Sequence, residues 1–145
     1  MNVKTLLAAK ALGGDIISIK PSADLAAAAK LLSAHRVGAL LIRGAGGRLA
    51  GILSERDIVR ALSEHGAAAL SLQVSEVMTR NVATCGEDDS LASIMEQMTA
   101  GKFRHMPVVS KGELVGLVSI GDVVKQRVDE IEHESEALRD YIRTA

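Results

Sequence analysis

Apolar side chains recur at the same helical spacing in two places along the chain. Both sets occupy positions i, i+3, i+4 and i+7: Leu25, Ala28, Ala29 and Leu32 in the first half, and Leu91, Ile94, Met95 and Met98 in the second. This spacing puts each set on one face of an α-helix. Ser22 and Asp88 stand just before the two sets, and both are residue types that cap helix N-termini. The pattern predicts two matching amphipathic helices.

Short apolar runs surround these helices in the same order in both halves. One run precedes each helix, at residues 16–19 and 82–84. Two runs follow each helix around a glycine-containing turn, at 39–42 with 49–53 and at 106–109 with 114–118. Runs of this length indicate strands, and a further helix begins near Asp57 and near Asp122. The predicted fold is therefore α/β (α+β), with a β-α-β-β-α motif that occurs twice.

Identical residues confirm that the chain repeats itself. Three pairs lie 65 positions apart: Gly51 with Gly116, Ser54 with Ser119, and Asp57 with Asp122. A motif of about 60 residues buries too little surface to be stable alone, so we expect the two to pack together with pseudo-two-fold symmetry. The predicted division is 1–66 for the N-terminal segment and first motif, 67–128 for the connector and second motif, and 129–145 for a C-terminal helical extension.

Composition and charge exclude several classes of function. The 145 residues carry 17 basic and 18 acidic side chains, and the aromatic residues are Phe103 and Tyr141 alone. The balanced charge argues against the strongly basic surface of a nucleic-acid-binding protein, and the scarcity of aromatic residues argues against base stacking. The single Cys85 excludes an internal disulfide and a cysteine-rich metal site, and the four histidines lack ligand spacing. Without a long apolar run or a signal-like N-terminus, we expect no membrane partner and a cytoplasmic protein.

The doubled pattern Gly-apolar-apolar-Ser-x-x-Asp resembles a tandem pair of CBS domains, which are named after cystathionine β-synthase. Residues 37–42 and 103–109, which precede the two copies, contribute to the likeness, and it covers roughly residues 10–128. The chain is similar to small stand-alone bacterial proteins made of one CBS pair. The resemblance implies an adenine nucleotide, with AMP as the first choice and ADP, ATP or NAD as alternatives, bound in clefts between the repeats. It also implies a regulatory role towards an unidentified partner protein, with no enzymatic activity and no catalytic cofactor.

The repeated residues suit such a ligand chemically. A carboxylate at a helix N-terminus, as predicted for Asp57 and Asp122, can accept hydrogen bonds from both ribose hydroxyls, and the family uses its matching Asp in this way. Ser54 and Ser119 can donate to a phosphate beside the free N–H groups of the helix start. Ile52 and Leu117 supply an apolar face for the purine. The alternative interpretation is that Ser-x-x-Asp only caps a helix.

Basic residues add candidate phosphate ligands. By the resemblance, Arg104 and His105 reach from the start of a strand into the central cleft, where arginine can bind a phosphate through two parallel hydrogen bonds. The alternative is a strand end with solvated charges. The other ligand candidates are the phosphate ligands Lys20 and Arg56, Thr84 beside the base or ribose, Met106 and Pro107 on the strand after His105, and Gly121, which permits close backbone approach.

The C-terminal segment carries a separate apolar stripe. It consists of Val124, Val128, Ile131, Leu138 and Ile142 at roughly 3.5-residue spacing, interrupted by Ser135. Such a stripe favours a partner helix, and stand-alone CBS pairs often dimerise, so we expect a homodimer. The alternative is that this helix folds back on its own body. For the whole chain the prediction is a nucleotide-sensing regulatory module, and its rival is a purely structural, oligomerising module with empty clefts.

Overall fold

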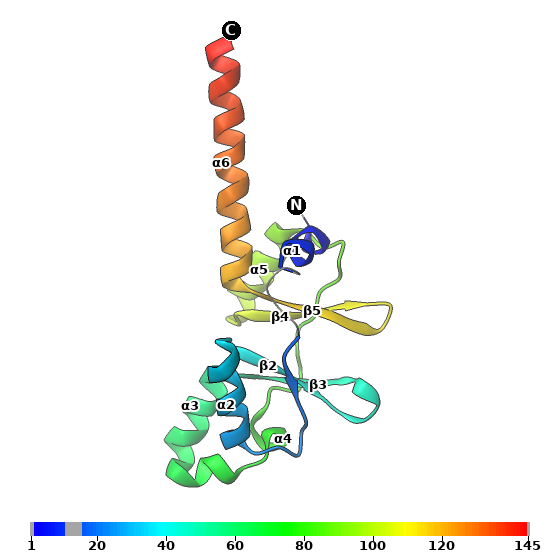
Figure 1. Ribbon diagram of the computed structural model, residues 1–145, viewed down its shortest axis with the longest axis vertical. Coiled ribbons are helices and arrows are strands. Elements are labelled where there is room, and N and C mark those ends of the chain that lie inside the picture. The colour runs from blue at the N-terminus through cyan, green and yellow to red at the C-terminus, as the bar shows by residue number, and fades with distance from the viewer. Residues whose placement is uncertain (1, 11–15, 145) are drawn as a thin grey trace.

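The two repeats stack with their sheets facing each other, and one long helix projects from the second repeat (Figure 1). The structure is a computed structural model that describes residues 2–10 and 16–144. The elements up to the connector are α1 (Val3–Lys10), β1 (Ser18–Ile19), α2 (Leu25–His35), β2 (Ala39–Arg43), η1 (Ala45–Gly47), β3 (Leu49–Ser54), α3 (Glu55–His65), η2 (Gly66–Ser71) and α4 (Val74–Val77). The remaining elements are α5 (Leu91–Gly101), β4 (His105–Ser110), β5 (Glu113–Ser119) and α6 (Ile120–Thr144).

The first repeat forms a sheet of three strands. β1 runs parallel to β2, with Ser18 opposite Leu41, and β2 runs antiparallel to β3, with Leu41 opposite Ile52. The turn between β2 and β3 contains Gly46 and Gly47, which both have a positive φ that glycine adopts without strain. The predicted order of strands and helices is confirmed in this half.

The second repeat departs from the prediction at its first strand. Residues 82–84 form no strand; instead, Cys85 alone bridges to Val108 in a parallel sense. The bridge consists of two hydrogen bonds, from the Cys85 N–H to the Pro107 carbonyl at 3.0 Å and from the Val109 N–H to the Cys85 carbonyl at 2.9 Å. The prediction of a strand at 82–84 was therefore wrong, because the chain reaches the edge of the sheet only at Cys85. β4 and β5 pair antiparallel as predicted.

The N-caps of α2 and α5 are also different from those predicted. Asp24 caps α2 by accepting a hydrogen bond from the Ala27 N–H at 2.8 Å, and Ser90 caps α5 by accepting one from Ser93 at 3.1 Å. The predicted caps lie two positions earlier, within the turns that lead into the helices. Both positions carried a suitable polar residue, so residue type alone could not separate them.

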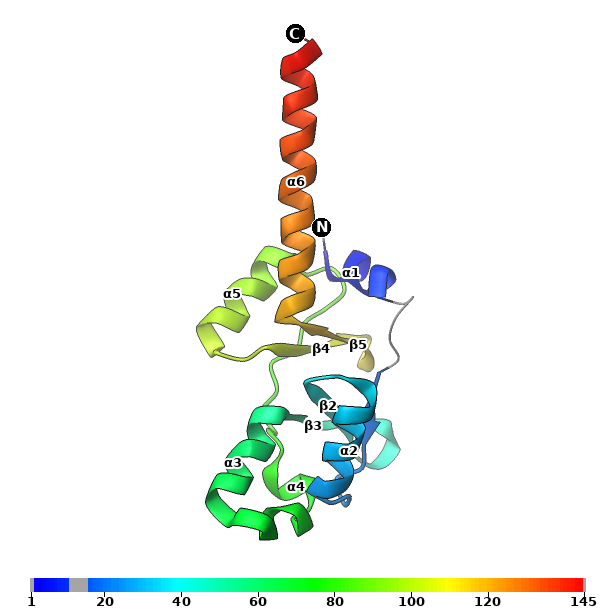
Figure 2. The same cartoon turned by 60° about the vertical axis from the view of Figure 1, so that its left-hand side comes forward.

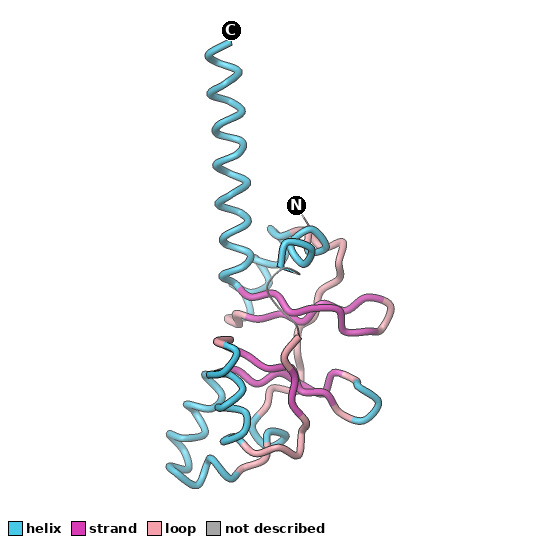
Figure 3. The backbone as a smooth tube through the Cα atoms, viewed as in Figure 1, coloured by secondary structure: helices cyan, strands magenta, loops and turns pink. Residues whose placement is uncertain are grey.

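Three apolar clusters among the described residues hold the molecule together. Two lie between a sheet and its own helices, so that the layers follow the order helices, sheet, sheet, helices (Figures 2 and 3). The third lies between the two sheets: Ala39, Leu41 and Ile52 are buried there, with Leu114 and Leu117 of the other sheet packed against them. This third cluster explains why two small repeats form one body, because each sheet covers the apolar face of the other.

Each repeat also packs against a segment that lies, in sequence, beyond the predicted boundary between residues 66 and 67. The Val74 N–H at the start of α4 donates to the Ala23 carbonyl at 2.8 Å, and the Val3 N–H at the start of α1 donates to the Asp89 carbonyl at 2.9 Å. The two contacts are equivalent, because residues 23 and 89 occupy matching positions of the repeat. Thus α4 packs on the core of the first repeat, whereas α1 packs on that of the second.

The repeated glycines lie where these segments cross the strands. A Cβ atom on Gly51 would come within 2.6 Å of the Thr79 carbonyl oxygen, and a Cβ on Gly116 would come within 2.6 Å of the Leu7 side chain. Glycine at both positions therefore permits the close approach of the crossing segment.

The helix α6 begins on the body and then leaves it. Val123 is fully buried, whereas every residue from Ile131 to Arg143 is exposed. The alternative that this helix folds back on its own protomer is therefore not what the structure adopts. Among the described helices, α6 included, none combines the length and the apolarity that crossing a bilayer requires.

Candidate functional site

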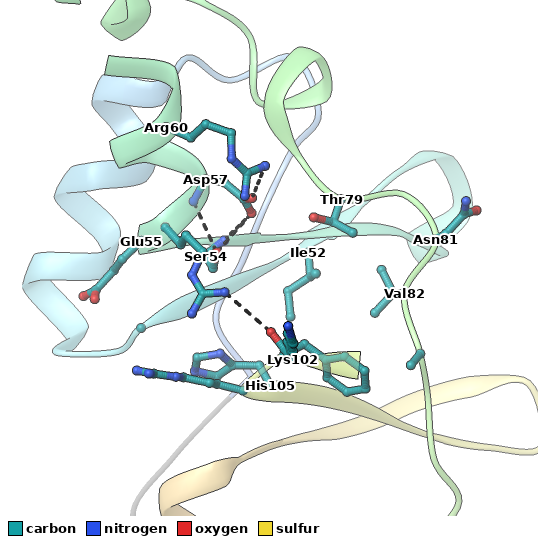
Figure 4. Close-up of a pocket in the computed structure, with 15 residues that line it drawn as sticks. Ile52, Ser54, Glu55, Asp57, Arg60, Thr79, Asn81, Val82, Lys102 and His105 are labelled. Carbon is teal, nitrogen blue, oxygen red and sulfur yellow. Dashed lines mark hydrogen bonds and ion pairs between the residues drawn. The ribbon is translucent and has the colours of Figure 1, made fainter. Parts of the chain in front are cut away.

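A cleft of about 390 Å³ opens between the two repeats, at the start of α3 (Figure 4). Its size falls within the range of small-molecule sites. Three parts of the chain line it, namely the first repeat, the connector and the second repeat: Gly38, Ile52, Ser54, Glu55, Arg56, Asp57 and Arg60; Thr79, Asn81, Val82 and Ala83; and Lys102, Phe103, Arg104 and His105. A molecule bound here would touch both repeats.

The Ser-x-x-Asp motif forms the wall of the cleft at the N-terminus of α3. Ser54 is the N-cap residue, and its side chain accepts a hydrogen bond from the Asp57 N–H at 3.3 Å. In return the Asp57 Oδ2 accepts hydrogen bonds from the Ser54 N–H at 2.9 Å and from the Ser54 Oγ at 3.1 Å. This is a complete capping box, so the motif caps α3. The same geometry holds the carboxylate rigidly beside the cleft.

The other carboxylate oxygen of Asp57, Oδ1, is available to a ligand or to a cation. Oδ1 lies 3.8 Å from an Arg60 guanidinium nitrogen, a separation that indicates a weak ion pair with a largely exposed arginine. The Asp57 side chain itself is only 7% exposed. A buried carboxylate with one lightly occupied oxygen can accept a hydrogen bond from a hydroxyl group that enters the cleft.

Positive charge dominates the rest of the lining. The four permanently cationic side chains are those of Arg56, Arg60, Lys102 and Arg104, against the two carboxylates of Glu55 and Asp57. The lining therefore has a formal charge of +2 with His105 neutral, although the whole chain has a formal charge of −1. A local excess of this sign attracts anions, and phosphate groups most of all.

One contact ties the two repeats together across the cleft. Arg56, at the start of α3, donates to the Lys102 carbonyl oxygen at 3.5 Å, and Lys102 ends α5 in a left-handed conformation with a φ of 57°. A hydrogen bond at this length is weak. Arg56 can therefore turn from the carbonyl to an anion without losing much stabilisation.

Apolar groups line the opposite part of the cleft. Ile52 is 9% exposed and packs in the cluster between the sheets, together with Val82. The backbone of Ile52 exchanges two hydrogen bonds with Thr79, at 3.0 and 2.9 Å, which fixes the connector against β3. Such a surface, next to a carboxylate and several cations, suits a flat apolar ring attached to a polar, anionic group.

The structure brings together six of the predicted ligand residues in this cleft: Ile52, Ser54, Arg56, Asp57, Arg104 and His105. The imidazole of His105 lies over Gly38, since a Cβ on that glycine would be 3.3 Å from the ring. The two residues come from different repeats. Gly38 thus leaves the space that the His105 ring occupies.

Four other predicted residues lie elsewhere. Lys20 is exposed in the turn before α2, and Thr84 is exposed one residue beyond the cleft lining. Met106 is fully buried in the core of the second repeat, because alternate residues of β4 point to opposite faces of the sheet. Pro107 is buried within β4 opposite Leu117. None of these four side chains lines this cleft, and their roles as ligand residues stay predictions.

The second repeat reproduces the motif without the same charge. The Ser119 N–H donates to the Asp122 carboxylate at 3.0 Å, and the Asp122 N–H donates to the Ser119 Oγ at 3.1 Å. Gly121 stands where the first repeat has Arg56. A second ligand site remains a prediction, formed by Leu117, Ser119, Gly121 and Asp122.

Nine lining residues were not predicted from the sequence: Gly38, Glu55, Arg60, Thr79, Asn81, Val82, Ala83, Lys102 and Phe103. The repeat offered a signal for two of them. Gly38 occupies the position that matches Arg104, and Lys102 occupies the position that matches the basic residue Arg36. The connector residues had no such signal. Their place depends on the path that the chain takes between the repeats.

The described residues include no cluster of three histidine, cysteine, aspartate or glutamate side chains placed to hold a metal ion. Cys85 lies away from the cleft, in the core of the second repeat. Burial, with a smaller contribution from Asp89, raises the pKa of its thiol to about 11. The thiol therefore stays protonated at neutral pH, and we assign it no chemical role at the site.

Comparison with known proteins agrees with this geometry. A solved CBS-domain protein of Agrobacterium tumefaciens, ATU1752, is 44% identical and superposes with a TM-score of 0.83 over 87% of this chain and 92% of its own. The CBS domain pair of protein MJ0100, solved in complex with 5′-methylthioadenosine and S-adenosyl-L-methionine, is 27% identical, with a TM-score of 0.78 over 90% of this chain and 98% of its own.

Curated relatives are longer than this chain. The mitochondrial CBS domain-containing protein CBSX3 of Arabidopsis thaliana is 36% identical over 120 residues, which are 80% of this chain and 58% of the relative. An uncharacterised 17.7 kDa protein of Acidianus ambivalens is 35% identical over 112 residues, 77% of this chain and 66% of the relative. The model of the CBS domain matches residues 11–64 and again residues 74–129. With two matched copies, one on each side of the cleft, the chain belongs to the CBS-domain family.

Proposed function

We propose that the chain is a regulatory module that binds an adenine nucleotide, AMP by first choice, in the cleft between its two repeats. The observation that carries the proposal is the composition of the cleft: a rigid carboxylate at a helix start, an apolar wall and a formal charge of +2 in a slightly acidic protein. The MJ0100 pair, which was solved with two adenosine-containing ligands, supports the ligand class. We further propose a cytoplasmic homodimer without enzymatic activity.

Each part of the nucleotide has a partner of matching chemistry in the cleft. The Asp57 carboxylate accepts hydrogen bonds from the ribose hydroxyls, since Oδ1 is the less occupied oxygen. Arg56 and Arg104 hold the phosphate, with His105 beside them. The purine packs against Ile52 and Val82. ADP, ATP and NAD carry the same adenosine group and remain alternatives for the ligand.

Signalling follows from the position of the cleft. A ligand that touches α3, the connector and the start of β4 contributes binding energy only when the two repeats are set to close around it. It therefore shifts the population towards that setting, which a partner protein can recognise. The weak contact from Arg56 to Lys102 is the one expected to change on binding.

The test is to identify what co-purifies with the protein by native mass spectrometry, followed by thermal unfolding of the stripped protein with AMP, ADP, ATP, NAD and adenosine. A ligand at 100 times its dissociation constant adds about 2.7 kcal/mol to the free energy of unfolding. We expect the largest increase with AMP and a smaller one with adenosine. If no nucleotide co-purifies and none raises the melting temperature, the clefts are empty and the module is structural.

A further inference from the structure

The projecting helix α6 carries an apolar stripe that the described part of the protomer leaves largely exposed. The exposed fractions along it are high: Val124 41%, Val128 46%, Ile131 57%, Leu138 60% and Ile142 65%. Apolar side chains aligned over this length of helix are unfavourable in water. Figure 1 shows α6 extending away from both sheets, so the stripe is open to another molecule along its length.

The stripe lies to one side of the face of α6 that contacts the protomer's own body. The body-facing side of α6 is marked by buried Val123 and by half-buried Arg127 and Glu130. At 3.6 residues per turn, the stripe lies about a quarter of a turn around the helix from that side. A second helix can therefore pack along the stripe without meeting the body of the first protomer.

The stripe follows the heptad spacing of a coiled coil. In heptad notation Val128, Ser135 and Ile142 occupy a positions, while Val124, Ile131 and Leu138 occupy d positions. β-branched residues at a with leucine at d favour two parallel helices, a pattern that Val128 and Ile142 at a and Leu138 at d follow, whereas Ile131 at d does not. A polar residue at a single a position, here Ser135, favours one register at some cost in stability.

The charges beside the stripe decide which partner and which orientation fit. In a parallel, in-register pair, each g position faces the e position five residues later on the other helix. Here Arg127 faces Glu132 of the partner subunit, and Glu134 faces Arg139 of the partner subunit, so both pairs have opposite charges. An antiparallel pair with the same overlap would instead bring Glu132 near its own copy, and Glu134 near its own copy.

We infer that the α6 helices of two copies of this chain form a parallel, in-register coiled coil, with the two bodies on opposite sides of the seam. The inference deepens the homodimer of the proposed function, and it requires no bound nucleotide. Arg127 also donates to Glu130 of its own helix at 2.8 Å, which weakens its share in the seam. The pair formed by Glu134 and Arg139 is therefore the sharper one to test.

The first experiment exchanges charges across the seam. Glu134→Arg alone and Arg139→Glu alone each place like charges opposite one another, and each should weaken dimerisation by about tenfold, as two reversed surface pairs predict. An equimolar mixture of the two variants restores both attractive pairs, so it should form heterodimers with near wild-type affinity. Sedimentation velocity with one variant fluorescently labelled measures both effects. Unchanged single variants, or a mixture without heterodimers, would overturn the inference.

The second experiment tests orientation by disulfide formation. In the parallel arrangement the two copies of residue 142 face each other across the seam, within the Cα separation that a disulfide spans. Ile142→Cys should therefore form a covalent dimer under mild oxidation, whereas Asp140→Cys, on the outer face, should not. The buried Cys85 does not compete. Equal cross-linking of both variants, or of neither, contradicts the parallel coil. Nucleotide binding measured on the same variants is expected to be unchanged, so failure of the coil would leave the nucleotide proposal standing.

Discussion

Replacing Asp57 by asparagine separates the two roles that the structure assigns to this residue. The carboxylate accepts two hydrogen bonds from Ser54, at 2.9 and 3.1 Å, and stands in the first turn of α3. Asparagine keeps the shape and one acceptor oxygen but loses the negative charge at the positive end of the helix. That loss costs about 0.5–1 kcal/mol of the free energy of unfolding.

The loss of nucleotide affinity should be larger than the loss of stability. A hydrogen bond to a charged group contributes about 1.5–3 kcal/mol, so Asp57→Asn should weaken AMP by roughly 10–150-fold in a calorimetric titration. The loss should be confined to ribose recognition. Wild-type protein should therefore prefer AMP to its 2′,3′-dideoxy analogue, and the variant should bind the two with similar affinity.

The matched control is Asp122→Asn. Asp122 makes the equivalent hydrogen bonds at the start of α6, so its replacement should cost a similar free energy of unfolding. It should leave binding in the cleft beside Asp57 unchanged. If Asp57→Asn keeps wild-type affinity for AMP, or loses AMP and the dideoxy analogue equally, the carboxylate serves only as a helix cap and the ribose role is refuted.

Three further outcomes are expected. Arg104→Ala should weaken AMP about tenfold or more but adenosine less than about twofold, as measured by titration, because adenosine has no phosphate for a guanidinium to hold; equal losses would remove Arg104 from the phosphate site. Gly51→Ala should cost about 1–3 kcal/mol of unfolding free energy in urea titrations, since its Cβ would lie 2.6 Å from the rigid Thr79 carbonyl, and Gly116→Ala should cost less because a movable side chain is the obstacle there; the reverse order would contradict this packing. Because the Cys85 pKa rises from 9.0 to about 11 on folding, the unfolded chain loses this proton first and stability should fall as pH rises from about 9 to 11; a Cys85→Ala variant with the same decline would exclude the thiol as its cause.

Sequence patterns predicted the structure correctly wherever residues within one element determine it. The i, i+3, i+4, i+7 spacing correctly located α2 and α5, and the Ser-x-x-Asp motif correctly located the starts of α3 and α6. They failed at residues 82–84, where three residues of strand-like composition make no pairing. A strand needs a partner edge within reach, and that edge is defined by the rest of the fold.

The residues of the cleft likewise include some that a sequence motif identified and others that no motif marked. The internal repeat singled out Ser54 and Asp57, and with the resemblance it led to Arg104 on the facing repeat; all three line the cleft. Met106 was also predicted, although the alternation of β4 turns its side chain into the core. The connector residues and Lys102 complete the lining without any motif to mark them. The connector residues reach the cleft because the connector crosses β3 at Gly51, and Lys102 reaches it from the end of α5.

By itself, the sequence determined the doubled motif, the capping of its second helices and the heptad stripe of α6, because each depends on residues within a few turns or strands of one another. Only the tertiary structure decided that α1 packs on the second repeat and α4 on the first, that the cleft gathers its positive charge from both repeats, and that α6 leaves the body with its stripe uncovered. These features depend on contacts between residues far apart in the chain, and periodicity carries no information about which distant faces meet.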